Sequence, residues 1–180
     1  MRVIAGNARG RKLTAPAGEH TRPTADRIKE SIFNIIQFDI EGRVVLDLFA
    51  GSGQMGLEAL SRGAASCIFV DNDRDACRAI AGNLSAVSLT GGKVVQMDYK
   101  AFLKSTKERF DLIFLDPPYS ELHIPKSLAV IEKFDILSKG GIIICESEKD
   151  CSLPDSVGGL QKGKEYFYGI TKITLFRRYE

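Results

Sequence analysis

Short, continuously apolar runs recur along the chain and alternate with segments of helical periodicity. The run RVVLDLF at 43–49 is followed by the helix-like QMGLEALSRG, and further strand-like runs occupy 66–71, 93–98, 110–116 and 142–147. Strands that are apolar at every position, rather than at every second one, are typical of a parallel sheet covered by helices on both faces. The pattern therefore predicts an α/β fold with a doubly wound, mostly parallel sheet.

Both ends of the chain depart from this alternation. Two last strand-like stretches, 163–169 and 171–180, are separated by Gly169-Ile170, which predicts an antiparallel hairpin and brings the sheet to seven strands. At the start, RVIAG and RKLTAPAG predict a small β-hairpin, and Pro23 precedes a helix with isoleucines at helical spacing. We expect residues 1–22 to form a small N-terminal β-hairpin extension and 23–180 to form the main domain.

Composition excludes several classes of protein. The 180 residues are 44% hydrophobic and 27% charged, which is ordinary for a globular protein. No apolar stretch approaches the length of a membrane span, and charges and glycines interrupt the N-terminus where a signal peptide would be apolar. The four cysteines form no C-x-x-C pair, and only two histidines are present. We expect a cytoplasmic protein without a metal site or a membrane partner.

Charge is distributed unevenly along the chain. The formal net charge is +2, but residues 1–30 carry seven Lys or Arg residues against three acids. Such a basic leading segment fits contact with a polyanion, and it equally fits a solvated, charged edge of the fold. Charge alone does not separate these two interpretations.

A glycine-rich loop follows the first strand of the alternating region and opens a helix. Residues Gly51, Gly53 and Gly56 fit G-x-G-x-x-G, a weak signal for a nucleotide-type ligand held at a helix N-terminus. Asp47 stands four residues before the loop, where a carboxylate would repel a pyrophosphate. The same carboxylate would suit a ligand that carries an ammonium group and a sulfonium.

Acidic residues stand at or near the ends of four consecutive predicted strands: Asp47, Asp71, Asp98 and Asp116. Asp71 is placed to accept hydrogen bonds from ribose hydroxyls and Asp98 from the exocyclic amine of adenine. Each acid alone would be explained as a cap on the following helix. Four of them around one crevice favour a pocket for a cationic cofactor that contains adenosine, and we infer S-adenosylmethionine.

The strand FDLIFLD ends in Asp116-Pro117-Pro118-Tyr119. The prolines remove backbone donors, so the Asp116 carboxylate and the Pro117 carbonyl could together accept both hydrogens of a planar amine. Holding both hydrogens can draw the nitrogen towards a pyramidal geometry and aim its lone pair at a methyl donor. Tyr119 supplies a flat face on which a base can stack. The alternative is a Pro-Pro turn in which Tyr119 only packs.

The motifs LDLFAGSGQMGLEALSRGA, FVDND and FDLIFLDPPY resemble those of class I methyltransferases that modify exocyclic nitrogens of nucleic-acid bases. The opening RVIAGNARGRKL with TRPTADRIKESIFNII resembles more specifically the RsmD family of 16S rRNA guanine-N2 methyltransferases. The resemblance runs the whole length of the chain. It implies a Rossmann-like methyltransferase that transfers a methyl group to the N2 amine of one guanine in 16S rRNA, within a small-subunit assembly intermediate. We expect a monomer.

The resemblance also assigns roles to individual residues. The cofactor set is Asp47, Phe49, Gly51, Ser52, Gly53, Asp71, Asn72 and Asp98, and the catalytic set is Asp116, Pro117 and Tyr119. Basic residues would contact the RNA: Arg9, Arg11, Lys12 and Arg22. Arg22 and Arg27 could instead pair with acids near the cofactor.

Three rival functions stay open. A DNA adenine-N6 or cytosine-N4 methyltransferase would share D-P-P-Y, but 180 residues leave little room for a DNA-reading domain. A dinucleotide oxidoreductase is disfavoured by Asp47 and by the lack of a substrate domain. A non-catalytic RNA-binding protein on the same fold would have no chemical reason to keep Asp116 and Tyr119.

Overall fold

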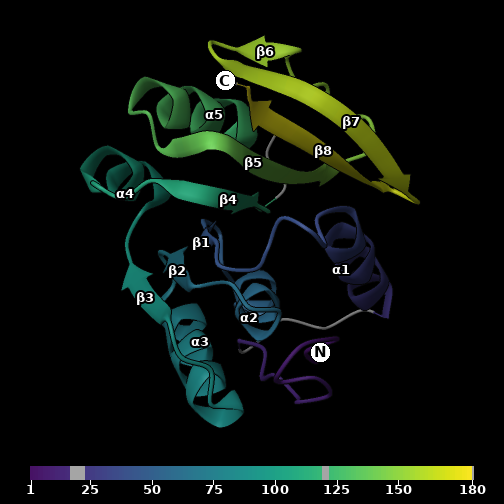
Figure 1. Ribbon diagram of the computed structural model, residues 1–180, viewed down its shortest axis with the longest axis vertical. Coiled ribbons are helices and arrows are strands. Elements are labelled where there is room, and N and C mark those ends of the chain that lie inside the picture. Colours follow the sequence, from purple (N-terminus) through teal and green to yellow (C-terminus); the bar gives the residue numbers. More distant parts are fainter. Residues whose placement is uncertain (17–22, 119–121, 180) are drawn as a thin grey trace.

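One eight-stranded sheet runs through the centre of the computed structural model, which describes residues 1–16, 23–118 and 122–179 (Figure 1). The strand order is β3-β2-β1-β4-β5-β8-β7-β6. The strands are β1 (Val44–Asp47), β2 (Ser66–Asp71), β3 (Gly92–Gln96), β4 (Phe110–Leu115), β5 (Leu137–Glu148), β6 (Ser156–Val157), β7 (Leu160–Tyr168) and β8 (Thr171–Arg178).

The direction of the strands confirms the predicted doubly wound architecture. Strands β3, β2, β1, β4 and β5 are parallel, whereas β8, β7 and β6 continue the sheet antiparallel. The sheet has eight strands rather than seven because the two-residue β6 pairs with the start of β7. The order of strands reverses between β1 and β4, and open α/β sheets bind ligands at the carboxyl ends of strands at such a switch point.

In the described ranges, helices cover the two faces of the sheet (Figure 1): α1 (Pro23–Ile35), α2 (Gln54–Ser61), α3 (Arg74–Val87), α4 (Tyr99–Ser105) and α5 (His123–Lys133). Apolar side chains of α1, α2 and α3 form one buried cluster with one sheet face, and those of α4 and α5 form a second cluster with the other. Strands buried on both faces explain why the sequence of β1, β2 and β4 is apolar at nearly every position.

The connection from α5 to β5 differs from the prediction. The sequence predicts a strand at 142–147, but β5 begins at Leu137, which pairs with Phe110. The next pair in the register is Leu112 with Ile142, so Gly140 and Gly141 lie in an irregularity inside the strand. Gly140 has a φ of 70°, which a glycine adopts without the steric cost of a side chain.

Within residues 1–16, the N-terminal segment pairs with itself over a short distance. An antiparallel bridge joins Arg2 and Lys12, and the Val3 N–H donates to the Arg11 carbonyl at 3.0 Å. Val3, Ala8 and Leu13 are buried in the cluster that α1, α2 and α3 share. The predicted division after residue 22 falls outside the described residues and stays a prediction. Across the described part of the chain, no helix combines the length and hydropathy needed to span a membrane.

Candidate functional site

The glycine loop joins the end of β1 to the start of α2. Gly51 and Gly53 have φ values of 51° and 75°, in the left-handed region that favours glycine. At Gly56 a side chain would clash, since a Cβ would lie 2.3 Å from the Phe69 ring and 2.6 Å from the Cys67 sulfur. Two glycines therefore allow the turn and the third allows α2 to pack closely on β2, as G-x-G-x-x-G loops require.

Asp47 lies beneath this loop. Its side chain is 3% exposed, and its Oδ2 accepts the Gly56 N–H at 2.9 Å. Burial, opposed by the Gly56 hydrogen bond and aided by the nearby Asp116 and Asp71 carboxylates, raises the pKa of Asp47 to about 8. The carboxylate thus holds the first turn of α2 in place, and its predicted contact with a cofactor stays a prediction.

Asp71 connects the end of β2 to the glycine loop. Its Oδ2 accepts the Gly51 N–H at 2.8 Å, and its Oδ1 accepts the Asp73 N–H at 2.9 Å. Asp73, rather than Asp71, caps α3 through the Asp75 N–H. The half-buried Asp71 carboxylate is therefore oriented by two backbone donors, and the neighbouring Asn72 is exposed.

Asp98 caps the helix α4, which is one of the two roles predicted for it. It is exposed, and its Oδ1 accepts the N–H groups of Lys100 and Ala101 at 2.9 and 3.2 Å at the start of α4. Capping orients the carboxylate at the same edge of the sheet as Asp71. A role in holding an adenine amine would be additional to the cap.

The D-P-P-Y segment begins directly after β4. Asp116 is exposed and Pro117 is half-buried, at the carboxyl end of the strand next to β1 and its glycine loop. The two elements with candidate chemistry therefore meet at the switch point of the sheet. The predicted Tyr119 lies outside the described residues.

Three rings lie together near this edge, and two of them were not predicted. Phe49, a predicted cofactor residue, packs against Tyr99 with ring centroids 4.9 Å apart and against His123 at 6.0 Å. The Tyr99 hydroxyl lies 3.3 Å from His123 Nδ1. Tyr99 and His123 could have been predicted only from their positions in the sequence, because Tyr99 follows Asp98 directly and His123 comes shortly after D-P-P-Y. These rings form an aromatic wall (Phe49, Tyr99 and His123) beside the loop.

Ser52 links the glycine loop to the N-terminal segment. It is buried, its hydroxyl donates to the Met1 sulfur at 3.2 Å, and its carbonyl accepts from Asn83 Nδ2 at 3.2 Å. Asn83 also holds Thr14, accepting from its N–H at 2.8 Å and donating to its carbonyl at 2.9 Å. The loop is therefore supported by residues from both ends of the N-terminal segment.

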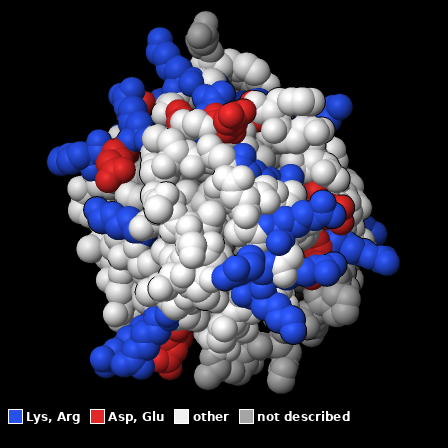
Figure 2. Space-filling model, turned by 60° about the horizontal axis from the view of Figure 1, so that its bottom comes forward, with Lys and Arg blue, Asp and Glu red and all other residues white. Residues whose placement is uncertain are grey.

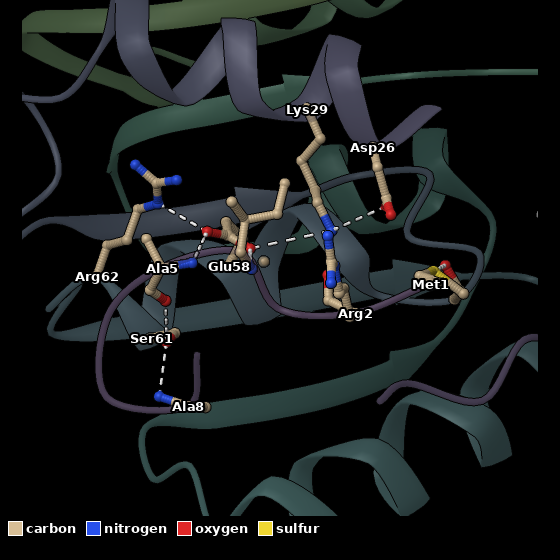
Figure 3. Close-up of polar contacts among 12 residues, drawn as sticks. Met1, Arg2, Ala5, Ala8, Asp26, Lys29, Glu58, Ser61 and Arg62 are labelled. Carbon is tan, nitrogen blue, oxygen red and sulfur yellow. Dashed lines mark hydrogen bonds and ion pairs between the residues drawn. The ribbon is translucent and has the colours of Figure 1, made fainter. Parts of the chain in front are cut away.

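A buried polar network fastens the same segment to α2 (Figure 3). Glu58 is completely buried, and its carboxylate accepts the N–H groups of Ile4 at 2.7 Å and Ala5 at 3.0 Å. Lys29 of α1 lies 3.9 Å from Glu58, and Arg62 lies 2.8 Å from it. The segment, α1 and α2 thus meet at one carboxylate.

The predicted RNA-contacting residues lie on the outside of that segment. Arg9, Arg11 and Lys12 are exposed, and the Arg11 guanidinium donates to the Ala86 carbonyl at the end of α3. Figure 2 shows Lys and Arg side chains gathered to the right of centre on the face where Figure 1 places the N-terminal segment and the start of α1. Arg22 lies outside the described residues.

The cysteines are structural in their surroundings. Cys67, Cys77 and Cys145 are buried and Cys151 is half-buried, and none of the four forms a disulfide. Burial raises the pKa of the Cys67, Cys77 and Cys145 thiols, which keeps them protonated. Within the described ranges, no three His, Cys, Asp or Glu side chains are grouped to hold a metal ion.

Comparison with known proteins agrees with the fold. The chain is 42% identical over 182 residues to YlbH from Bacillus subtilis (strain 168), with 99% of each chain covered. It is 33% identical over 178 residues to the Ribosomal RNA small subunit methyltransferase D of Escherichia coli (strain K12), with 99% of this chain and 90% of the relative covered.

The solved structure of yhhF from Escherichia coli matches with a TM-score of 0.91 at 31% identity, over 99% of this chain and 98% of that one. The family model described as Conserved hypothetical protein 95 matches residues 1–177. With this match over nearly the whole chain, and with relatives that are small-subunit rRNA methyltransferases, the chain belongs to the Conserved hypothetical protein 95 family, the RsmD family of rRNA methyltransferases.

Proposed function

We propose that this protein transfers a methyl group from S-adenosylmethionine to the N2 amine of one guanine in 16S rRNA, within a small-subunit assembly intermediate. The observation that carries the proposal is the meeting of Asp116-Pro117 with the glycine loop at the switch point of the sheet. The relative named Ribosomal RNA small subunit methyltransferase D supports RNA of the small subunit as the substrate class.

The charges at the site fit a cationic cofactor better than a pyrophosphate. Asp47, Asp71 and Asp116 approach one another at the ends of neighbouring strands, and their mutual repulsion contributes to the raised pKa of Asp47. A positively charged ligand relieves this repulsion, whereas a phosphate would increase it. S-adenosylmethionine, when bound, supplies a sulfonium whose methyl group is open to attack by a nucleophile.

Residues around the glycine loop would bind and orient this cofactor. The two Asp71 oxygens each accept one backbone N–H, and each keeps a further lone pair that can accept a ribose hydroxyl. Gly51, Ser52 and Gly53 let the backbone approach the ligand closely, and Asn72 and Asp98 line the adenosine side. The aromatic wall next to Asp98 offers apolar surface that excludes water from the adenine and the target base.

The Asp116 carboxylate and the Pro117 carbonyl would hold the target amine. An aryl amine is a weak nucleophile because its lone pair is delocalised into the ring. Accepting both hydrogens orients the nitrogen and favours the pyramidal geometry that attack requires. Tyr119 would stack on the base after it turns out of its RNA helix, and Arg9, Arg11, Lys12 and Arg22 would hold the surrounding phosphates.

The test is methyl transfer from radiolabelled S-adenosylmethionine to small-subunit particles and to their naked RNA, followed by mass mapping of the labelled base. We expect label on N2 of a single guanine. Label on DNA alone would contradict the RNA substrate, and the absence of cofactor binding in calorimetry would contradict the enzyme.

Asp116→Ala tests the role of the amine clamp. We expect transfer to fall at least a hundredfold while cofactor affinity stays within a factor of a few, since the clamp contacts the base rather than the cofactor. Asp155→Ala is the control, because Asp155 is a 94% exposed carboxylate paired with Lys162, next to β6 at the end of the strand order far from β1 and β4. Equal loss of transfer and cofactor binding in Asp116→Ala would assign Asp116 to the cofactor instead.

A further inference from the structure

Glu146 is a carboxylate at the site edge to which neither the motifs nor the reaction scheme gives a role. Leu115 of β4 pairs in register with Cys145 of the parallel strand β5. The residues that follow these two, Asp116 and Glu146, therefore lie side by side at the carboxyl ends of the strands. Leu115 and Cys145 face the helices α4 and α5. Because side chains alternate along a strand, Glu146 faces the other side, where the glycine loop and α2 lie.

Among the described residues, none donates a hydrogen bond to the Glu146 carboxylate. The side chain is half-buried, and among the described residues it makes neither a hydrogen bond nor an ion pair. Its neighbours across and along the sheet include the buried Ile144 and Ile173. Burial, and then the charge of Asp116, raise the pKa of Glu146 to about 8. A half-buried acid next to a second acid costs stability, and a ligand that brings N–H donors would offset that cost.

The bases that carry an exocyclic amine differ at the ring nitrogen beside it. In guanine the N2 amine lies between N3, an acceptor, and N1–H, a donor on the Watson–Crick edge. In adenine and cytosine the ring nitrogen beside the amine is an acceptor. The ionised form of Glu146 next to the amine clamp therefore accepts from N1–H of guanine and repels the lone pair of the other two bases.

We propose that Glu146 accepts the N1–H of the target guanine while Asp116 and Pro117 hold its N2 amine, so that Glu146 sets the base specificity of the enzyme. The inference rests on the proposed function, since it needs a guanine held at the Asp116 clamp. It adds a reason for guanine in particular, which D-P-P-Y by itself does not supply.

The experiment compares two RNA substrates that differ at the methylated position found by mass mapping, one with guanine and one with 2-aminopurine. Both bases carry the 2-amine, but 2-aminopurine has an acceptor at N1. For the native protein we expect kcat/KM to favour guanine by about tenfold or more, the effect of one hydrogen bond to a charged group. Glu146→Ala should lower kcat/KM for guanine, should not lower it for 2-aminopurine, whose N1 lone pair the carboxylate repels, and should so remove the preference.

Two variants keep this test interpretable. Glu146→Gln preserves shape and one acceptor oxygen, so it should retain part of the activity on guanine and gain on 2-aminopurine, whose N1 can accept from the amide. Glu148→Ala is the matched control, because Glu148 is an exposed glutamate two residues further along β5. Cofactor affinity and melting temperature, measured for each variant, report on folding independently of base choice.

The outcomes separate this inference from the function on which it rests. If the native protein labels neither RNA while binding the cofactor, the guanine substrate is wrong and the inference falls with it. If it labels guanine and 2-aminopurine equally, the proposed function stands and the inference is wrong. A preference for guanine that persists in both Glu146→Ala and Glu146→Gln would likewise exclude Glu146 as the residue that reads N1–H.

Discussion

Replacing Glu58 by alanine should destabilise the protein more than any surface substitution. Glu58 is completely buried, accepts the N–H groups of Ile4 and Ala5, and is paired with Arg62 and Lys29 (Figure 3). Lys29 is itself 1% exposed, and burial lowers its pKa against the opposing charge of Glu58. Removing the carboxylate leaves a buried ammonium with its other partners only, namely the Arg2 carbonyl and Asp26.

The magnitude follows from the number of groups that lose a partner. Removing one member of a buried ion pair costs about 3–5 kcal/mol, because the remaining charge is buried without compensation. The Ile4 and Ala5 amides also lose their acceptor, although the N-terminal segment can expose them to water. We expect Glu58→Ala to lower the free energy of unfolding by about 3–5 kcal/mol, a large part of the ~5–15 kcal/mol typical of a domain.

Urea unfolding followed by circular dichroism measures this loss, and hydrogen exchange locates it. The amides of Ile4 and Ala5 should exchange faster in Glu58→Ala, since this substitution releases the segment from α2. Glu30→Ala is the matched control, because Glu30 is an exposed glutamate on α1, and its effect should stay within about 0.5 kcal/mol. The double variant Glu58→Gln with Lys29→Met, which removes both charges, should recover part of the stability.

A loss below about 1 kcal/mol for Glu58→Ala would refute the reasoning. It would mean that Asp26, the Arg2 carbonyl or water compensates the Lys29 ammonium once Glu58 is removed. Unchanged exchange at Ile4 and Ala5 would show that the N-terminal segment is held by its apolar residues alone.

Three further results are expected. Asp47→Asn should flatten the pH dependence of stability. Because the pKa of Asp47 is raised in the folded protein, this group lowers the free energy of unfolding by up to ~1.4 kcal/mol for each unit by which the pH rises between about pH 4 and pH 8. If the free energy of unfolding, measured in urea, changed equally with pH in the two proteins, the burial of this charge would be contradicted. Gly56→Ala should cost about 1–3 kcal/mol by overpacking α2 against β2, whereas Gly82→Ala, where a Cβ meets nothing within 4 Å, should be neutral or stabilising; melting curves that do not separate the two would show that α2 shifts freely. The double variant Arg9→Ala with Lys12→Ala should weaken RNA binding and reduce the salt dependence, d log K/d log[salt], by about 1 for each lost phosphate contact, and an unchanged slope would place the RNA on another face.

The elements that the sequence predicted are those whose signals are local. Apolar runs, glycine positions and the Gly169-Ile170 turn each act within a few residues, and the parallel strands, the strand–loop–helix at Gly51 and the final hairpin are all present. The predicted start of β5 was wrong because the prediction relied on a local signal. Gly140-Gly141 is locally a break, and only pairing with β4 carries the strand through it.

The amino-acid sequence by itself determined the class of sheet, the glycine loop and the family of this protein, and it predicted the amine clamp. Only the tertiary structure decided which charged groups are buried together and which carboxylates stand side by side. Glu58 meets Ile4 across 54 positions of the chain, and Glu146 comes next to Asp116 through the register of β4 and β5. Burial and proximity of this kind arise when distant segments pack, and no local pattern records them because each residue alone is compatible with an exposed position.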